Sequence, residues 1–236
     1  IFVAVATDAT APATAAETVI PLPAASTRLA IRAARMIDGR SERLHREAVV
    51  IVEGERIVAV GGNELLTPGL ETLDLGDATL MPGLLDAHSH PLITVDDYQT
   101  DHLRHSSAYK ALRGLKAVQD NLRAGWTTLR IAGDADVAYA VSDLRKAIDG
   151  GLFLGPRLSG AAHYLSTTGG GGDINFLAPE VHVAADGRIA DGVDEVRKAV
   201  REEIKYGSDW VKLLVTGAFM SAGDRPQDVH FSPEEL

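Results

Sequence analysis

The chain has 236 residues, of which 45% are hydrophobic and 24% charged, a composition typical of globular proteins. Its net charge of −10, with 23 basic residues scattered among 33 acidic ones, disfavours a nucleic-acid partner, because phosphate binding requires clustered Lys and Arg. The chain has no Cys, so disulfides and thiolate metal sites are excluded, and any metal must be held by His and carboxylates. No apolar run approaches the roughly 20 residues that cross a bilayer, so we expect no membrane partner.

The first 27 residues are set apart by their composition. Residues 1–6 are apolar and lack an initiating Met, and Ala, Thr and Pro are frequent from there to Thr27. Small residues that follow an apolar stretch are typical of a secretory signal near its cleavage point. Residues 1–27 are therefore interpreted as an N-terminal extension or a signal remnant. The second interpretation favours a periplasmic or secreted protein over a cytoplasmic one.

Residues 28–80 have the pattern of short strands separated by turns. Apolar or alternating runs are interrupted by turn dipeptides such as Asp38-Gly39 and Gly61-Gly62. The predicted strands are residues 29–34, 48–53, 56–60 and 72–75. This region is predicted to form part of a small β-sandwich.

After Met81 the pattern changes to strands that alternate with helices. Apolar residues at helical spacing predict three helices, with stripes at Leu112, Leu115, Val118 and Leu122, at Val137, Val141, Leu144 and Ile148, and at Val193, Val196, Val200 and Ile204. Gly125, Gly150 and Gly207 follow these stripes, where glycine commonly ends a helix. The predicted strands are residues 84–87, 126–131, 157–159 and 210–215. Continuously apolar strands in this order favour a parallel sheet covered by helices.

These four units make an α/β fold that is half of a larger one. An eight-unit barrel needs roughly 250 residues, and only about 155 follow Met81. Residues 81–236 are therefore predicted to be the first four βα units of a (β/α)8 TIM-type barrel. The last residues, Ser232-Pro233-Glu234-Glu235-Leu236, are typical of the capped beginning of a helix, so we expect the natural polypeptide to continue.

His88 and His90 form the first chemical motif, within Met81-Pro82-Gly83-Leu84-Leu85-Asp86-Ala87-His88-Ser89-His90-Pro91. Side chains alternate along a strand, so both imidazoles share one face with Asp86. Barrel active sites lie at the carboxyl ends of the strands, and neutral imidazole is a good ligand for zinc and similar ions. Two His at this spacing also occur by chance, but the pair ends an apolar strand and is closed by Pro91.

Lys212 is the second motif, because it lies in the middle of the apolar run 210–215. A buried ammonium is costly, and burial favours the neutral amine. Such an amine can react with carbon dioxide to form a carbamate, whose two oxygens can bridge two metals. A lysine that extends to solvent at a strand end, or a catalytic lysine without metal, would fit the same pattern.

These motifs and the segments around them resemble the metal-dependent amidohydrolase superfamily. The segments are "GERIVAVG", "LMPGLLDAHSHP", "AGWTTLR", "LGPRLSG", "STTGGGGD" and "SDWVKLLVTGAFMS", in this order along nearly all of the chain after Thr27. They are most similar to the imidazolonepropionase-like branch, which includes Xaa-Pro dipeptidases and ochratoxin-hydrolysing amidases. Two positions depart from the branch, Gly171 in place of a His and Ile131 in place of an Asp, and both put substrate preference in doubt.

The resemblance implies a centre of two divalent metal ions, most commonly zinc. His88 and His90 would bind one ion, and carboxylated Lys212 would bridge both. Two further His and one Asp, which would complete the centre, lie outside this chain. The implied reaction is hydrolysis of an amide or peptide bond by a metal-bridging hydroxide. The implied substrate is a dipeptide or an N-acyl amino acid, a class to which ochratoxin-like compounds belong. The implied assembly is a homo-oligomer.

Other functions fit the same scaffold. A cyclic-amide hydrolase or a deaminase would use the same ligands, since function depends on the site and not on the fold. A metal-free remnant that serves as a non-catalytic subunit would retain the fold alone. Candidate substrate-binding residues are the polar side chains that follow the predicted strands, namely His163, Tyr164, Arg225 and His230.

Overall fold

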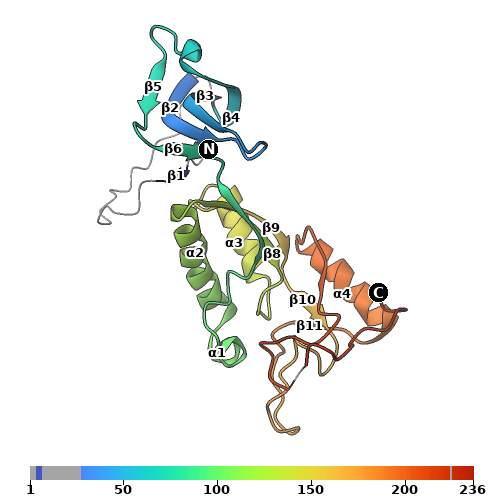
Figure 1. Ribbon diagram of the computed structural model, residues 1–236. Coiled ribbons are helices and arrows are strands. Elements are labelled where there is room, and N and C mark those ends of the chain that lie inside the picture. The colour runs from blue at the N-terminus through green and yellow to red at the C-terminus, as the bar shows by residue number, and fades with distance from the viewer. Residues whose placement is uncertain (1–3, 7–27, 224) are drawn as a thin grey trace. The chain divides into compact units, whose positions relative to one another are not determined.

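The computed structural model describes residues 4–6, 28–223 and 225–236 (Figure 1). The chain divides into two units, Ile1–Leu84 and Leu85–Leu236, each with its own apolar core. Apart from the short strand Ala4–Ala6, the predicted extension lies outside the described residues. Each unit is described by itself.

The strands of the first unit form one six-stranded mixed sheet. They are β1 (Ala4–Ala6), β2 (Arg28–Ile37), β3 (Leu44–Glu53), β4 (Arg56–Gly61), β5 (Glu71–Asp74) and β6 (Thr79–Met81), with a short 3-10 helix η1 (Asn63–Leu65) after β4. β2, β3 and β4 are consecutive antiparallel neighbours, whereas β5 and β6 run parallel to β2. The predicted strands are confirmed, but the described strands form a single sheet, so the β-sandwich stays a prediction.

Both faces of this sheet are apolar, because successive side chains of β2 and β3 point to opposite sides. Ile31 and Val50 belong to one buried cluster, and Ala30 and Val49 belong to the other. β3 begins four residues earlier than predicted. Residues 45–47 are polar, and Glu47 has a φ of 49°, a conformation that apolar periodicity does not reveal.

The predicted strands and helices of the second unit follow in the predicted order. The elements of this unit are β7 (Leu84–Ser89), α1 (Tyr98–Arg104), α2 (Ser107–Arg123), β8 (Trp126–Ala132), α3 (Ala140–Asp149), β9 (Arg157–Ala161), β10 (Tyr164–Ser166), β11 (Arg188–Ile189), α4 (Gly192–Lys205) and β12 (Lys212–Leu213). Of these, α1, β10 and β11 are additional elements that the sequence pattern does not predict. The strands form two three-stranded sheets, ordered β7-β8-β9 and β11-β10-β12. β9 runs parallel to β8, and β10 runs parallel to both β11 and β12. No closed barrel forms among the described residues.

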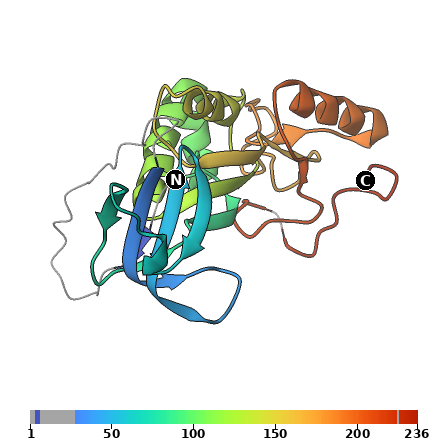
Figure 2. The same cartoon turned by 90° about the horizontal axis from the view of Figure 1, so that it is seen from above.

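Helices α2 and α3 lie side by side against β8 and β9 (Figures 1 and 2). Val118 of α2 and Leu144 of α3 are buried in one cluster with Leu129 of β8 and Leu158 of β9. The predicted stops are confirmed: α2 ends before Gly125, whose φ is 93°, and α3 is followed by its cap residue, Gly150.

The buried face of α4 is rotated from the predicted one. Val193 and Ile204 are 39% and 63% exposed, whereas Ala199 and Glu203 are buried with Val196. Val196 and Val200 of the predicted stripe pack into the core, but Val193 and Ile204 do not, because Glu203 takes the buried position and its carboxylate accepts hydrogen bonds from other elements. α2 shows the same effect on a smaller scale, since Lys110 is buried while Leu112 is 68% exposed.

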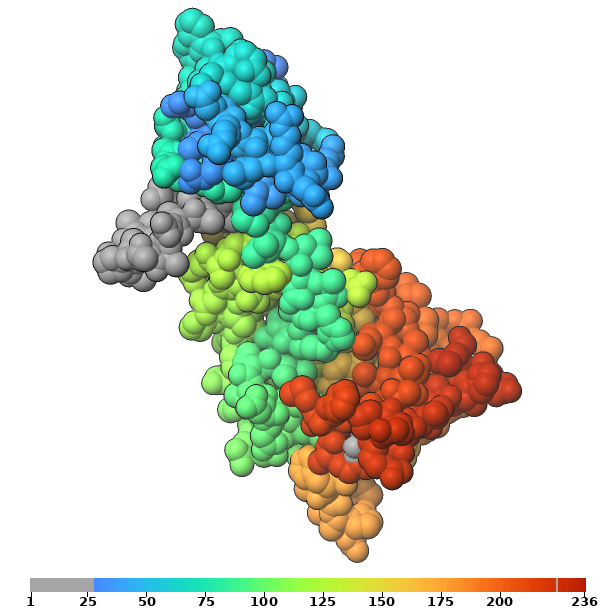
Figure 3. Space-filling view, in the orientation of Figure 1, coloured from blue at the N-terminus to red at the C-terminus, as the bar shows by residue number. Residues whose placement is uncertain are grey.

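The segment after α4 is less regular than predicted. The strand expected at residues 210–215 is limited to β12, which pairs with β10 in the described part of the chain. The last residues form one hydrogen-bonded turn, in which the Ser232 amide donates to the Glu235 carboxylate at 2.7 Å. Figure 3 shows part of the red segment that follows α4 beside a pale-orange loop between β10 and β11. A Cβ built on Gly223, in the first of these segments, would lie 3.6 Å from the Cβ of Asn175. Among the described residues, no helix is long and apolar enough to span a membrane.

Candidate active site

The two histidines of β7 lie side by side. The ring centroids of His88 and His90 are 5.1 Å apart, as expected for residues on one face of a strand. His88 is exposed and His90 is half-buried. The Asp86 carboxylate accepts a hydrogen bond from the His88 amide at 2.9 Å, which fixes the backbone that presents the pair.

The imidazole of His90 is oriented by the chain that follows β8. Its Nδ1–H donates to the carbonyl oxygen of Gly133 at 2.6 Å, which leaves the Nε2 lone pair available. Burial lowers the pKa of His90, the hydrogen bond to Gly133 opposes this shift, and the electrostatic effects of His88 and Lys212 add to it. His90 is therefore held neutral, in the tautomer that a metal ligand requires.

Gly133 and Asp134 fix this orientation from two directions. Gly133 has a φ of 82°, and a Cβ there would lie 2.4 Å from the Tyr164 amide nitrogen, so only glycine fits. The next residue, Asp134, accepts a hydrogen bond from the Leu92 amide at 3.0 Å through Oδ2. The turn therefore holds the His90 ring as well as the backbone two residues beyond it.

A buried polar cluster lies behind this turn. Asp134 is fully buried, its Oδ1 has no hydrogen-bond partner among the described residues, and burial raises its pKa to about 8. Nearby, the Lys110 ammonium is 3.0 Å from the Asp136 carboxylate and 3.0 Å from Nδ1 of His102. The sequence pattern does not single out these residues, although Gly-Asp-Ala-Asp directly after a buried parallel strand is a signal for them.

Lys212 is only half-buried, so the expectation of a lysine enclosed in an apolar strand is wrong. The reason is the position of β12, which is an edge strand among the described residues. Lys212 pairs in register with Tyr164, and its charge acts on His90.

His163 and Tyr164 are both buried and both have carboxylate partners. His163 Nδ1 is 2.7 Å from the Glu203 carboxylate, and the Tyr164 hydroxyl donates to Asp186 at 2.9 Å. Burial raises the pKa of Asp186 to about 6. These two predicted substrate residues therefore lie within the polar interior of the second unit.

Arg225 and His230 lie in the loop that follows β12. The Arg225 guanidinium forms an ion pair with Asp228 at 2.8 Å, and its side chain is 78% exposed. The His230 amide donates to the Val215 carbonyl at 3.1 Å, which ties this loop back to the segment after β12. Arg225 is on the surface and His230 is half-buried, in contrast to the buried His163 and Tyr164.

The residues around His90 fit a divalent metal ion. Two imidazoles on one face, one of them fixed through Nδ1, are nitrogen donors of the kind that zinc binds. The donor set is incomplete in the described residues, which contain no group of three or more His, Cys, Asp or Glu that could hold a metal ion. Lys212 is the third candidate beside the pair.

Residues 79–236 match the sequence profile of the Amidohydrolase family, which is more than half of the chain. The chain belongs to the amidohydrolase family. Among curated relatives, this amidohydrolase is 35% identical to ochratoxinase from Aspergillus niger over 229 residues, which are 87% of this chain and 46% of the relative. The chain therefore spans about half the length of the curated relatives it matches.

Solved structures extend the likeness. The crystal structure of A. niger ochratoxinase is 30% identical in sequence to this amidohydrolase, with a TM-score of 0.74. The match covers 89% of this chain and 52% of the ochratoxinase chain. A Xaa-Pro dipeptidase with bound methionine in its active site has a TM-score of 0.78 and 27% identity, over the same shares. The family resemblance noted in the sequence is thereby confirmed.

Proposed function

We propose that this amidohydrolase cleaves an amide or peptide bond in a dipeptide or an N-acyl amino acid, a class that includes ochratoxin-like amides. The observation that carries the proposal is the His88–His90 pair, with the His90 ring fixed on the Gly133 carbonyl, inside the segment that matches the family. The names of the relatives, ochratoxinase and Xaa-Pro dipeptidase, support the same class of bond.

His88, His90 and Lys212 would hold two divalent metal ions. Zinc fits best, because the chain offers imidazoles and no thiolates. Lys212, as a carbamate, would bridge both ions, and two His and one Asp from outside this chain would complete the set. Bound ions would supply a hydroxide nucleophile at neutral pH and polarise the carbonyl of the bond that is cleaved.

The chain's own side chains would orient the ligands and the substrate. The Gly133 carbonyl keeps the proton of His90 on Nδ1. Arg225 carries an exposed positive charge, and we propose that Arg225 and His230 contact the carboxylate of the substrate. His163 and Tyr164 would form the buried wall of the substrate site.

The proposal includes the architecture and the location of the whole protein. Residues 28–80 would be part of a small β-sandwich, and residues 81–236 would be the first half of a (β/α)8 barrel. Residues 1–27 would be an extension or a signal remnant of a periplasmic or secreted protein. A homo-oligomer would be its working form.

The test is the metal content of the whole protein, measured by elemental analysis, together with hydrolysis of a panel of dipeptides and N-acyl amino acids. We expect about two divalent ions per chain, and we expect Lys212→Ala to lose metal and activity together by at least about tenfold. Lys198→Ala, at an exposed position of α4, is the matched control and should change neither.

Each other outcome identifies a different function. Stoichiometric metal with turnover of cyclic amides or amines in place of the panel would favour the cyclic-amide hydrolase or the deaminase. Absence of stoichiometric metal, or full activity of Lys212→Ala, would overturn the proposal and favour the metal-free remnant.

A further inference from the structure

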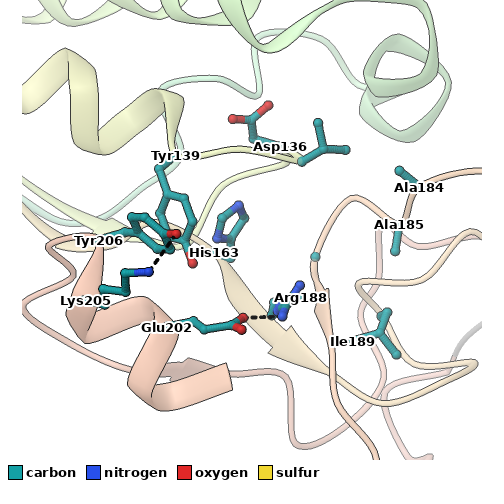
Figure 4. A pocket seen from close by; sticks show the side chains of 12 residues that line it. Asp136, Tyr139, His163, Ala184, Ala185, Arg188, Ile189, Glu202, Lys205 and Tyr206 are labelled. Atoms are coloured by element: carbon teal, nitrogen blue, oxygen red, sulfur yellow. Dashed lines mark hydrogen bonds and ion pairs between the residues drawn. The ribbon is translucent and has the colours of Figure 1, made fainter. Parts of the chain in front are cut away.

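A cavity of about 510 Å³ opens beside His163, on the side of the helices (Figure 4). It lies among the segment that precedes α3, the segment around β11 and the end of α4. Its lining includes Tyr139, His163, Arg188, Lys205 and Tyr206. The metal-ligand candidates are not part of this lining, and the volume is in the range of small-molecule sites.

The charges around the cavity favour an anionic ligand. Both lining carboxylates already have cations, since Asp136 is paired with Lys110 and Glu202 is paired with Arg188. The Lys205 ammonium, in contrast, has no carboxylate partner in the described part of the chain and contacts the Tyr206 hydroxyl at 3.2 Å. One positive charge therefore remains uncompensated at this cavity.

Two polar groups of the lining have no hydrogen-bond partner among the described residues, and a ligand could supply one to each. Nε of Arg188 is buried and has no hydrogen-bond partner among the described residues, so it needs an acceptor. Nδ1 of His163 is 2.7 Å from the Glu203 carboxylate and therefore carries a proton, and in the neutral imidazole Nε2 is left as an acceptor. Figure 4 shows the imidazole of His163 between the Tyr139 ring and Arg188. A ligand that meets both needs carries an anionic oxygen and an N–H or O–H donor.

Aromatic rings form one wall of the same cavity. The Tyr139 and Tyr206 rings have centroids 4.3 Å apart, and the Tyr139 ring meets the edge of His163 at 4.7 Å. Such rings provide a rigid apolar surface for a flat or aliphatic group. Val137 and Ile189 add apolar surface to the lining.

We propose that this cavity is a second ligand site, which binds a small carboxylate of the N-acyl amino acid class. Arg188 and Lys205 would receive the carboxylate, Nε2 of His163 would accept the amide N–H, and the two tyrosine rings would hold the apolar side chain. The site goes beyond the proposed hydrolysis and is independent of metal binding, because none of its residues is a candidate metal ligand and it shares only His163 with the proposed substrate wall.

The test is isothermal titration calorimetry with N-acetyl-L-phenylalanine on the whole protein carrying His88→Ala and His90→Ala, which excludes binding at the metal centre. We expect one binding event per chain. Lys205→Met and Arg188→Lys should each weaken it about fivefold or more, because each removes a charged hydrogen bond to the carboxylate. Lys198→Met, on the same helix but away from the cavity, is the matched control and should bind with unchanged affinity.

Two further probes test the chemistry of recognition. N-acetyl-L-phenylalaninamide lacks the carboxylate, and 3-phenylpropionate lacks the N–H donor, so both should bind more weakly than the acid. Absence of binding would overturn the proposal, and so would binding that Lys205→Met and Arg188→Lys leave unchanged. A failure of the proposed hydrolysis would appear separately, in the metal content and turnover of the unmodified protein.

Discussion

The carbonyl oxygen of Gly133 accepts a hydrogen bond from Nδ1–H of His90, and the same residue has no room for a side chain. We expect Gly133→Ala to displace this carbonyl, because the added Cβ would lie 2.4 Å from the Tyr164 amide nitrogen. Loss of such a partner commonly weakens metal affinity by about 10–100-fold. Competition with a chromophoric chelator would measure the change.

Gly151→Ala is the matched control for this variant. Gly151 also has a positive φ, 74°, but no atom lies within 4 Å of the position of its Cβ. The control should therefore lose about 1 kcal/mol of stability from backbone strain alone and keep its metal affinity. Equal loss of metal in both variants would contradict a specific role for Gly133.

Asp186 is fully buried, and its pKa is raised from 3.8 to about 6. The folded protein therefore holds this proton at pH values where the unfolded chain has released it. Stability should fall as pH rises from about 4 to about 6, by up to about 3 kcal/mol, and level off above. Asp186→Asn should remove this part of the pH dependence in urea unfolding, whereas Asp194→Asn, whose side chain is 96% exposed, should not.

The placement of a residue that depends on its own strand or helix can be predicted from the sequence. The burial of a residue that depends on distant partners cannot. The alternation of strand side chains places His88 beside His90 without reference to the rest of the chain. Lys110 and Asp134 depend on partners about 25 to 40 residues away, and their composition alone predicts exposure. The half-buried state of Lys212 was beyond prediction for a related reason, since it depends on which strands flank β12.

Helix α4 illustrates how a polar contact decides which face of an element is buried. Its apolar stripe predicts Val193 and Ile204 inside, but Glu203 is inside and accepts hydrogen bonds from the His163 amide and the Ser208 hydroxyl. Apolar periodicity locates the helix and its end correctly. It does not locate the face, because one buried carboxylate with several donors outweighs a pair of apolar side chains at the margin.

Glu203→Ala should therefore cost far more than Ile204→Ala. The first change leaves a buried imidazole N–H and a hydroxyl without their acceptor, which costs about 3–5 kcal/mol. The second removes a side chain that is 63% exposed and should cost under about 1 kcal/mol. Urea unfolding of both variants would measure the difference, and equal costs would contradict the assigned face of α4.

The molecule as a whole consists of two units with separate cores, and the candidate metal ligands belong to the second. Chelation of the metal should therefore destabilise the second unit alone. A ligand at 100 times its dissociation constant contributes about 2.7 kcal/mol, and this amount would be lost. Hydrogen exchange should become faster in β7 and β8 and stay unchanged in β2 and β3. Equal acceleration in both units would contradict this assignment.

For the whole molecule, the sequence predicts the order of strands and helices better than it predicts whether the strands close into a barrel. The alternation of strands and helices after Met81 follows from hydrophobic periods and glycine stops, and it is observed. Whether strands close into a barrel, or pack as a sandwich, depends on pairing between distant segments. Periodicity along the chain contains no information on that pairing, and the described strands form separate sheets.

Trp210 lies two residues before Lys212, and its indole N–H is 3.4 Å from the Ser159 hydroxyl. Its ring is 55% exposed and lies 5.9 Å from the guanidinium carbon of Arg130, whose Nε donates to the Ala87 carbonyl next to His88. The chain has two tryptophans, and the other, Trp126, packs against the apolar core. Intrinsic fluorescence of Trp210 therefore provides a built-in optical reporter, whose emission will respond when a ligand reorganises the strand ends around His88 and Lys212.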